Sequence, residues 1–316
     1  MPGTGLAQDE RFQRHKTGHA HPERPARLAA IAAALAERGL AATCTELEIL
    51  RAEAAHIQFV HAEGYIARVR RACQDGLPYI DVPDSAISPE SYEIALLAAG
   101  TVINAVDRVM SGELGNAFCA VRPPGHHAEH DHSMGFCLFN NIAIAAMHLI
   151  DTHGLSRVLI LDWDVHHGNA TQHTFEEDPR VLFISLHGHP AIVFPGTGYA
   201  HERGRGPGDG FTINLPMLPP SGDAEYRRAF DETILPAVER FDPQFVLVSA
   251  GFDGHRLDPL APLELETESF GWMTDEVVKV ARRHCDGRLV SVLEGGYHLE
   301  ALAECVCLHV ERLLAA

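Results

Sequence analysis

The 316-residue sequence has seven cysteines but no Cys-x-x-Cys pair, so neither a zinc ribbon nor a disulfide framework is indicated. Free thiols favour a reducing compartment. The N-terminus lacks a basic flank followed by an apolar core, which predicts that no signal peptide is present. No apolar run is long enough to span a bilayer. We therefore expect a cytoplasmic protein without membrane association.

Basic side chains are scarce, because 25 Lys and Arg stand against 43 Asp and Glu, a formal net charge of −18. So acidic a chain has no general attraction for nucleic acid or anionic lipid, and we expect no direct nucleic acid binding. The sequence also lacks a Pro/Ser-rich linker, a charge block and an internal repeat. The simplest interpretation is one domain over residues 1–316. The oligomeric state is left open, a homo-oligomer included.

Short apolar runs alternate with longer segments of helical character. The expected strands lie at residues 47–50, 117–121, 158–162, 181–186, 211–215, 245–249 and 289–293. The expected helices lie at residues 26–38, 63–73, 88–111, 141–153, 223–240, 267–285 and from 299 onward. Residues 1–24 are polar and carry no expected strand. This alternation favours an α/β fold with a parallel sheet and helices on both faces.

Unusual polar groups follow the expected strand at 158–162. Residues 162–169 read Asp-Trp-Asp-Val-His-His-Gly-Asn. Alternate residues of an extended chain point the same way, so Asp164 and His166 face one point in space. Ligands of open α/β sheets bind at the carboxyl ends of the strands. A carboxylate and an imidazole that converge there suit a zinc ion, although polar residues at strand ends also serve simply as caps.

Three other strands end in polar groups, which are His126-His127, Asp253 and Tyr297. If Asp253 lies beside Asp164 and His166, three ligands hold one metal and leave a position open, as in catalytic zinc sites. Two carboxylates among the ligands also fit Fe(II) or Co(II). The two histidines suit proton transfer, and Tyr297 suits a hydrogen bond to a developing oxyanion. These groups predict a metal-assisted amide hydrolase without a covalent intermediate.

Several motifs resemble, in order along nearly the whole chain, those of the zinc-dependent histone deacetylase family. They are residues 122–128 (Arg-Pro-Pro-Gly-His-His-Ala), 135–141 (Gly-Phe-Cys-Leu-Phe-Asn-Asn), 162–169, 194–198 (Phe-Pro-Gly-Thr-Gly), 249–254 (Ser-Ala-Gly-Phe-Asp-Gly) and 294–297 (Glu-Gly-Gly-Tyr). Residues 21–28 (His-Pro-Glu-Arg-Pro-Ala-Arg-Leu) resemble the class II branch, which includes the bacterial histone deacetylase-like and acetylpolyamine amidohydrolases.

The resemblance implies the arginase–deacetylase fold, a single α/β domain around a mostly parallel eight-stranded sheet. It implies one catalytic zinc on Asp164, His166 and Asp253. It makes His127 the general base and acid, His126 its electrostatic partner and Tyr297 the oxyanion donor. It pairs His126 with Asp162, and His127 with Asn169, which replaces the Asp of class I enzymes.

The resemblance also implies bound potassium and a substrate channel. A structural potassium ion would use Asp162, Asp164, His166, Ser185 and Leu186, and a second would lie near Phe175, Asp178 and Val181. Phe136 and Phe194 would wall a narrow channel, with Gly135 thinning one side and Leu260 at its rim. Gly295 and the rim residue Asp84 are further expected substrate contacts.

The resulting prediction is hydrolysis of the amide of an acylated primary amine, most of all N6-acetyl-lysine in proteins or peptides. Leu260 stands where a polyamine-specific relative has a gatekeeper Glu, which favours acetyl-lysine. The alternatives are a deacetylase of small molecules such as acetylpolyamines, and a non-catalytic module that binds acetylated amines. A ureohydrolase of the arginase type ranks lower, because only one full ligand set is visible.

Overall fold

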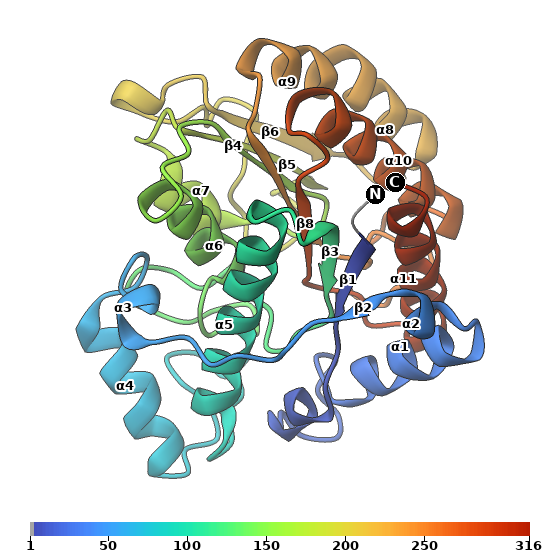
Figure 1. Ribbon diagram of the computed structural model, residues 1–316. Helices are drawn as coiled ribbons and strands as arrows, with labels where there is room; N and C mark the ends of the chain where they lie inside the picture. The colour runs from blue at the N-terminus through green and yellow to red at the C-terminus, as the bar shows by residue number, and fades with distance from the viewer. Residues whose placement is uncertain (1–2) are drawn as a thin grey trace.

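The computed structural model describes residues 3–316 and contains one eight-stranded sheet in the order β2-β1-β3-β8-β7-β4-β5-β6 (Figure 1). Every neighbouring pair is parallel, which confirms the predicted parallel sheet. The strands are β1 (Gly3–Ala7), β2 (Thr45–Glu46), β3 (Leu114–Cys119), β4 (Val158–Asp162), β5 (Val181–Gly188), β6 (Thr212–Met217), β7 (Phe245–Ala250) and β8 (Leu289–Leu293).

Helices cover both faces of this sheet. Helices α5 and α6 pack together on one face, and α1, α10 and α11 pack together on the other (Figure 1). The helices are α1 (Ala26–Glu37), α2 (Leu40–Thr43), α3 (Ala54–Ile57), α4 (Glu63–Gln74), α5 (Ser91–Met110), α6 (Asn141–Asp151), α7 (Asn169–Phe175), α8 (Asp223–Ala229), α9 (Leu235–Phe241), α10 (Thr267–His284) and α11 (Leu299–Leu314). None of them, within residues 3–316, combines the length and apolar character that a bilayer crossing requires.

The central strands β4, β5 and β7 are buried along their whole length. Because helices cover both of their faces, these strands are nearly continuous apolar runs rather than alternating ones. Strand β6 lies at the edge of the sheet and alternates, as its sequence predicts. Strand β4 is paired with β5 on one side and β7 on the other, so the residues that follow Asp162 emerge near the middle of the sheet.

The structure corrects three details of the predicted elements. Residues 47–50 form no strand, and β2 consists only of the two residues before them. The segment instead runs beside α5, where Asn104 Nδ2 donates to Glu48 O at 2.9 Å. Strand β1 was not predicted, because its glycines have low strand propensity. A Cβ at Gly5 would lie 2.7 Å from Leu114 Cδ1, so this glycine permits the close approach of β1 and β3. The helix expected at 223–240 is divided into α8 and α9 by a π-turn at Phe230–Ile234.

Candidate active site

Four neighbouring strands carry the candidate catalytic groups at one edge of the sheet. Strands β3, β8, β7 and β4 lie side by side in that order. All four run in the same direction, so their carboxyl ends meet at a single edge, where ligands of such sheets bind. The loops that leave them carry, in the same order, His126 and His127, then Tyr297, then Asp253, then Asp164 and His166.

Asp164, His166 and Asp253 form a buried group that could hold a metal ion, since one ligand atom from each lies within 4.8 Å of the others. Nδ1 of His166 lies 3.0 Å from Asp164 Oδ1 and 3.2 Å from Asp253 Oδ2. The backbone N–H of Val165 donates to the other oxygen of Asp253 at 2.8 Å. Oδ2 of Asp253 is buried and makes no hydrogen bond despite its approach to His166. A buried carboxylate oxygen without a hydrogen bond is expected where a cation binds, so this donor set fits zinc.

Two glycines make room for this group. A Cβ on Gly295 would overlap Oδ2 of both Asp253 and Asp164, and a Cβ on Gly251 would overlap Asp164. The backbone N–H of Gly295 donates to Asp164 Oδ2 at 2.7 Å. Gly295, expected as a substrate contact, therefore lies against the two carboxylates and orients one of them.

The two adjacent histidines have opposite electrostatic surroundings. Nδ1 of His126 lies 2.9 Å from Asp162 Oδ2. Although burial disfavours a charged ring, Asp162, Asp164 and Glu294 raise the pKa of His126 to about 10. Burial and the neighbouring His126 and His166 hold the pKa of His127 well below its usual range. His126 therefore keeps a proton at neutral pH, and His127 is left neutral and able to accept one.

Glu129 was missed at the sequence level and lies directly behind this pair. Nδ1 of His127 donates to Asn169 Oδ1 at 2.6 Å, and the amide nitrogen of Asn169 donates to the Glu129 carboxylate. His173 Nδ1 also lies 2.9 Å from Glu129. The Asn169 amide therefore connects His127 to the Glu129 carboxylate. It also keeps the His127 proton on Nδ1, so that Nε2 is free to take a proton. The position of Glu129, two residues after His127, was the available signal.

The loop that carries Tyr297 is held by two side chains from outside the predicted set, Asp258 and Arg27. Asp258 accepts a hydrogen bond from Tyr297 N at 2.6 Å. The buried guanidinium of Arg27 donates to the carbonyls of Glu294 at 2.5 Å and Gly296 at 2.7 Å, and lies 5.1 Å from the Tyr297 ring centroid. Burial raises the pKa of Tyr297 well above its usual range, so its hydroxyl stays protonated and can donate. Residue Arg27 belongs to the motif at 21–28, for which the sequence suggested no role.

Two aromatic rings flank the candidate metal group. The Phe194 ring lies 5.2 Å from that of His127, and the Phe136 ring lies 5.8 Å from that of Tyr297, both edge to face. A Cβ on Gly135 would overlap the His127 ring. The Leu260 residue is 39% exposed. Its backbone N–H donates to the Asp258 carboxylate at 3.0 Å, which holds this loop in place. This arrangement suits a narrow entrance for an aliphatic stem.

The remaining expected positions lie in three places. Asp84 accepts a hydrogen bond from Gly135 N at 3.3 Å, which places its carboxylate beside the Phe136 loop. Asp162 and Ser185 are register partners of β4 and β5, and Leu186 follows on β5. Around the expected second potassium, Asp178 N donates to Phe175 O and Val181 N donates to Asp178 O. Both potassium sites stay predictions.

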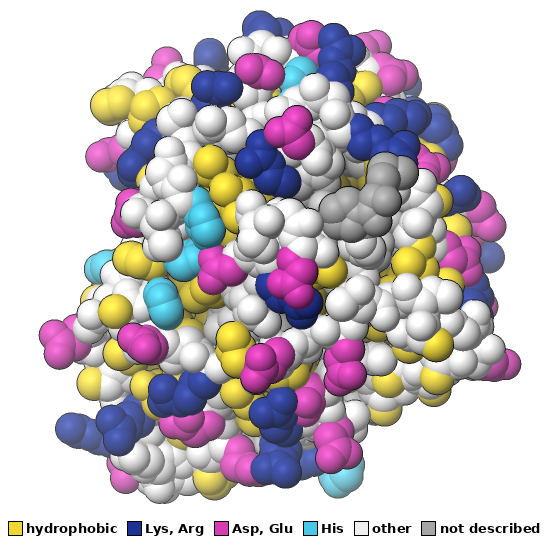
Figure 2. All heavy atoms as spheres, viewed as in Figure 1, with side chains coloured by type: hydrophobic (Ala, Val, Ile, Leu, Met, Phe, Trp, Pro, Cys, Tyr) yellow, Lys and Arg dark blue, Asp and Glu magenta, His cyan; other side chains and the backbone are white. Residues whose placement is uncertain are grey.

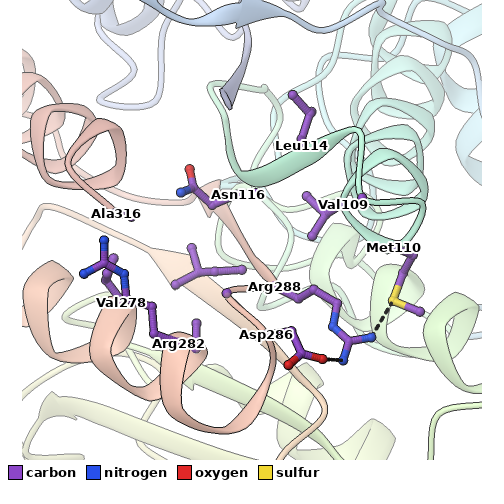
Figure 3. A pocket seen from close by; sticks show the side chains of 14 residues that line it. Val109, Met110, Leu114, Asn116, Val278, Arg282, Asp286, Arg288 and Ala316 are labelled. Carbon is purple, nitrogen blue, oxygen red and sulfur yellow. Dashed lines mark hydrogen bonds and ion pairs between the residues drawn. The ribbon is translucent and has the colours of Figure 1, made fainter. Parts of the chain in front are cut away.

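A cavity of about 570 Å³ lies away from this edge, at the amino ends of β3 and β8 (Figure 3). Its lining includes Leu114, Asn116 and Val278, together with Arg282 and Arg288. No His, and no group of converging carboxylates, lines it within the described residues. The chemistry is therefore assigned to the carboxyl edge of the sheet rather than to this cavity.

The comparison with protein families decides what this constellation belongs to. A model described as the histone deacetylase domain matches residues 21–313. The chain belongs to the histone deacetylase family. It is accordingly a hydrolase that acts on amides, as its motifs predict.

Relatives share this assignment but carry different names. A "Probable deacetylase" of Archaeoglobus fulgidus is 43% identical over 94% of this chain and 82% of its own length. The human "Polyamine deacetylase HDAC10" is 41% identical over 92% of this chain and 44% of its own length. A "Histone deacetylase-like amidohydrolase" of Pseudomonas aeruginosa is 44% identical over 80% of this chain and 66% of its own length. The solved "HDA15 HD domain" superposes with a TM-score of 0.95 at 38% identity, and covers 100% of this chain and 90% of that one. The last comparison confirms the predicted deacetylase fold.

Proposed function

We propose that this deacetylase removes acetyl groups from N6-acetyl-lysine in proteins or peptides, with zinc held by Asp164, His166 and Asp253. The observation that carries the proposal is the convergence of this buried group with His127, whose ring lies 5.9 Å from that of His166. A bound zinc ion supplies Lewis-acid polarisation of the amide carbonyl and lowers the pKa of water. A non-catalytic binding module would need neither a tuned base nor a hydroxyl donor.

The protein groups then divide the proton transfers between them. His127, oriented through Asn169, takes a proton from the attacking water and later gives it to the departing amine. His126 stays positive beside it and keeps the His127 pKa low, so that His127 is unprotonated before attack. The Tyr297 hydroxyl donates a hydrogen bond to the oxygen of the tetrahedral intermediate. Phe136 and Phe194 exclude water from the stem of the substrate.

The rim of the entrance supports lysine rather than a polyamine as the amine. An acetylpolyamine carries a second ammonium group, which a carboxylate at the rim would attract. Leu260, which we expect at this rim, has an exposed apolar side chain in place of such a carboxylate. A second candidate, deacetylation of acetylpolyamines, is favoured by the similarity to the human polyamine deacetylase and by the Asp84 carboxylate beside the Phe136 loop.

We extend the proposal to potassium, at Asp162 and Ser185 with the carbonyls near them, and to residues near Phe175. Its support is the register of β4 and β5, which sets Asp162 opposite Ser185. A monovalent cation there would offset part of the negative charge that Asp162 and Asp164 bring into a buried site.

The test is hydrolysis of a matched panel by zinc-loaded protein, with acetyl-lysine peptides, longer acyl-lysine peptides and acetylpolyamines. We expect turnover of acetyl-lysine peptides, blocked by a hydroxamate. Leu260→Glu should raise kcat/KM for acetylpolyamines relative to acetyl-lysine. Leu260→Gln is the control, because it introduces a side chain of nearly the same shape as Glu without the charge, and it should not change this ratio. Wild-type activity confined to polyamines would overturn the lysine assignment, and Asp84→Asn would then show whether that carboxylate binds the second ammonium group.

A further inference from the structure

A second group of metal-ligating side chains lies outside the active site. It consists of Asp107 on α5, His148 on α6 and His153 just after α6, and its ligand atoms also lie within 4.8 Å of one another. Nε2 of His148 and Nε2 of His153 each lie 2.7 Å from the same oxygen, Asp107 Oδ1. We propose that this group is a second divalent-metal site, of zinc type, with two imidazole nitrogens and one carboxylate oxygen as ligands.

The local fold brings the two histidines to one point. Helix α6 ends in a turn in which Leu155 N donates to Leu149 O and Gly154 has a φ of 70°. His153 lies in this turn, where Thr152 N and His153 N both donate to His148 O, so the His153 ring lies 5.3 Å from the His148 ring, nearly perpendicular to it. A residue with a Cβ would be strained at Gly154, so the glycine permits the chain to leave the helix directly after His153.

The ligand geometry needs only a small expansion. In a tetrahedral site with zinc–ligand distances near 2.0–2.1 Å, neighbouring ligand atoms lie about 3.3 Å apart. Each imidazole nitrogen must therefore move away from Asp107 Oδ1 by roughly half an ångström. The Asp107 side chain is 45% exposed and that of His153 is 23% exposed, so both have room to move. Three protein ligands leave a position for water or a fourth ligand, and the site opens to solvent.

Neighbouring groups favour a cation at this place. Thr152 Oγ1 lies 3.1 Å from His148 Nδ1, so it can accept the ring proton when Nε2 binds a metal, as outer-shell partners of metal-bound histidines do. Helices α5 and α6 both end within a few residues of the cluster, and the carbonyl ends of helices attract positive charge. Figure 2 shows histidine side chains gathered with an acidic one on the face that carries α3, α6 and the end of α5. The His56 ring of α3 lies 5.7 Å from that of His148, edge to face, and its Nδ1 accepts a hydrogen bond from Glu53 N, so it packs beside the group without being counted among its ligands.

The proposed site is independent of the catalytic one. His148 lies about 10 Å along α6 from Asn141, where the helix begins next to the motif at 135–141. Helix α6 leads toward the amino end of β4, whereas the catalytic groups Asp164 and His166 follow the carboxyl end of β4. A metal ion here would fasten α5 to the turn after α6 and touch no group of the proposed mechanism.

The experiment counts zinc in metal-free protein after equilibrium dialysis against zinc chloride, by elemental analysis. We expect about two zinc ions per wild-type chain and about one for His153→Gln, Asp107→Asn or Asp253→Ala. The double variant His153→Gln with Asp253→Ala should hold about none. His284→Gln is the matched control, because its two ring nitrogens face Asp242 and Glu239 separately and cannot share one ion.

Melting temperature provides a second measurement that does not depend on activity. In the Asp253→Ala background, zinc should raise the melting temperature, and adding His153→Gln should abolish the rise. The proposal is overturned if wild-type protein binds one zinc ion that Asp253→Ala removes and His153→Gln does not. Loss of zinc from His153→Gln alone, with Asp253→Ala unchanged, would instead overturn the catalytic ligand assignment and leave this one standing.

Discussion

The Tyr297 hydroxyl is the group whose role can be isolated most cleanly. Tyr297→Phe removes one oxygen atom and keeps the ring, which packs edge to face on Phe136 and lies beside the Arg27 guanidinium. The backbone bond from Tyr297 N to Asp258 is also kept. Loss of one oxyanion donor typically lowers kcat by about 10²- to 10³-fold, which corresponds to roughly 3–4 kcal/mol of transition-state stabilisation. Zinc content should not change, because the hydroxyl is not a ligand.

Tyr226→Phe is a matched control for this substitution. Tyr226 is fully buried on α8, and its hydroxyl has no hydrogen-bond partner. Removing an unpartnered buried hydroxyl should leave kcat unchanged and leave stability equal or about 1 kcal/mol higher. The assay is steady-state hydrolysis of an acetyl-lysine peptide, with zinc content and thermal unfolding measured on the same samples. Equal turnover of Tyr297→Phe and Tyr226→Phe would refute the proposed donor.

Three other substitutions test the site and its support. Asp253→Ala should lose the catalytic zinc by elemental analysis, and full occupancy would exclude this ligand. Glu129→Gln should lower kcat by roughly 10-fold at unchanged zinc content. It should also lower the pKa at which kcat/KM rises with pH, because the lost carboxylate no longer stabilises protonated His127. An unchanged pKa in this profile would contradict the proposed effect of Glu129 on His127. Burial alone would raise the pKa of Glu23, but Arg122 lowers it from 4.5 to about 2. The ion pair therefore stabilises the fold fully above pH 4.5. Its contribution, about 3 kcal/mol, is lost as the pH falls toward 2. Chemical denaturation of Glu23→Gln should show lower stability at neutral pH and a weaker dependence on pH in that range.

The local sequence was sufficient to predict most strands of the central sheet. The strands β4, β5, β7 and β8 are nearly continuous apolar runs, because each is buried on both faces. Strand β1 was not recognisable, because its residues Gly-Thr-Gly-Leu-Ala have little strand propensity and its place depends on contact with β3. The same holds for residues 47–50, where Leu47 N donates to Leu6 O of β1 at 3.0 Å but no regular strand pairing continues.

The candidate site divides in the same way. Asp164 and His166 are two residues apart on extended chain, so their convergence follows from spacing alone. The contacts of Arg27 with the Tyr297 loop join residues more than 260 positions apart, so no local sequence pattern predicts them. Glu129 reaches Asn169 across 40 positions, and Asp107 meets His148 across 41. The chemistry was therefore predictable from local motifs, whereas the groups that orient it depended on the fold.

One buried carboxylate joins the two halves of the active site. Glu23 pairs with Arg122, which precedes the loop of His126 and His127, and with Arg27, which holds the Tyr297 loop. All three side chains are fully buried, so removing one charge leaves the others uncompensated, typically at a cost of about 3–5 kcal/mol. The position of His127 relative to Tyr297 thus depends on an ion cluster that touches no substrate. This accounts for the motif at 21–28 in physical terms: its Glu23 and Arg27 link the loop of the proposed base to the loop of the proposed oxyanion donor.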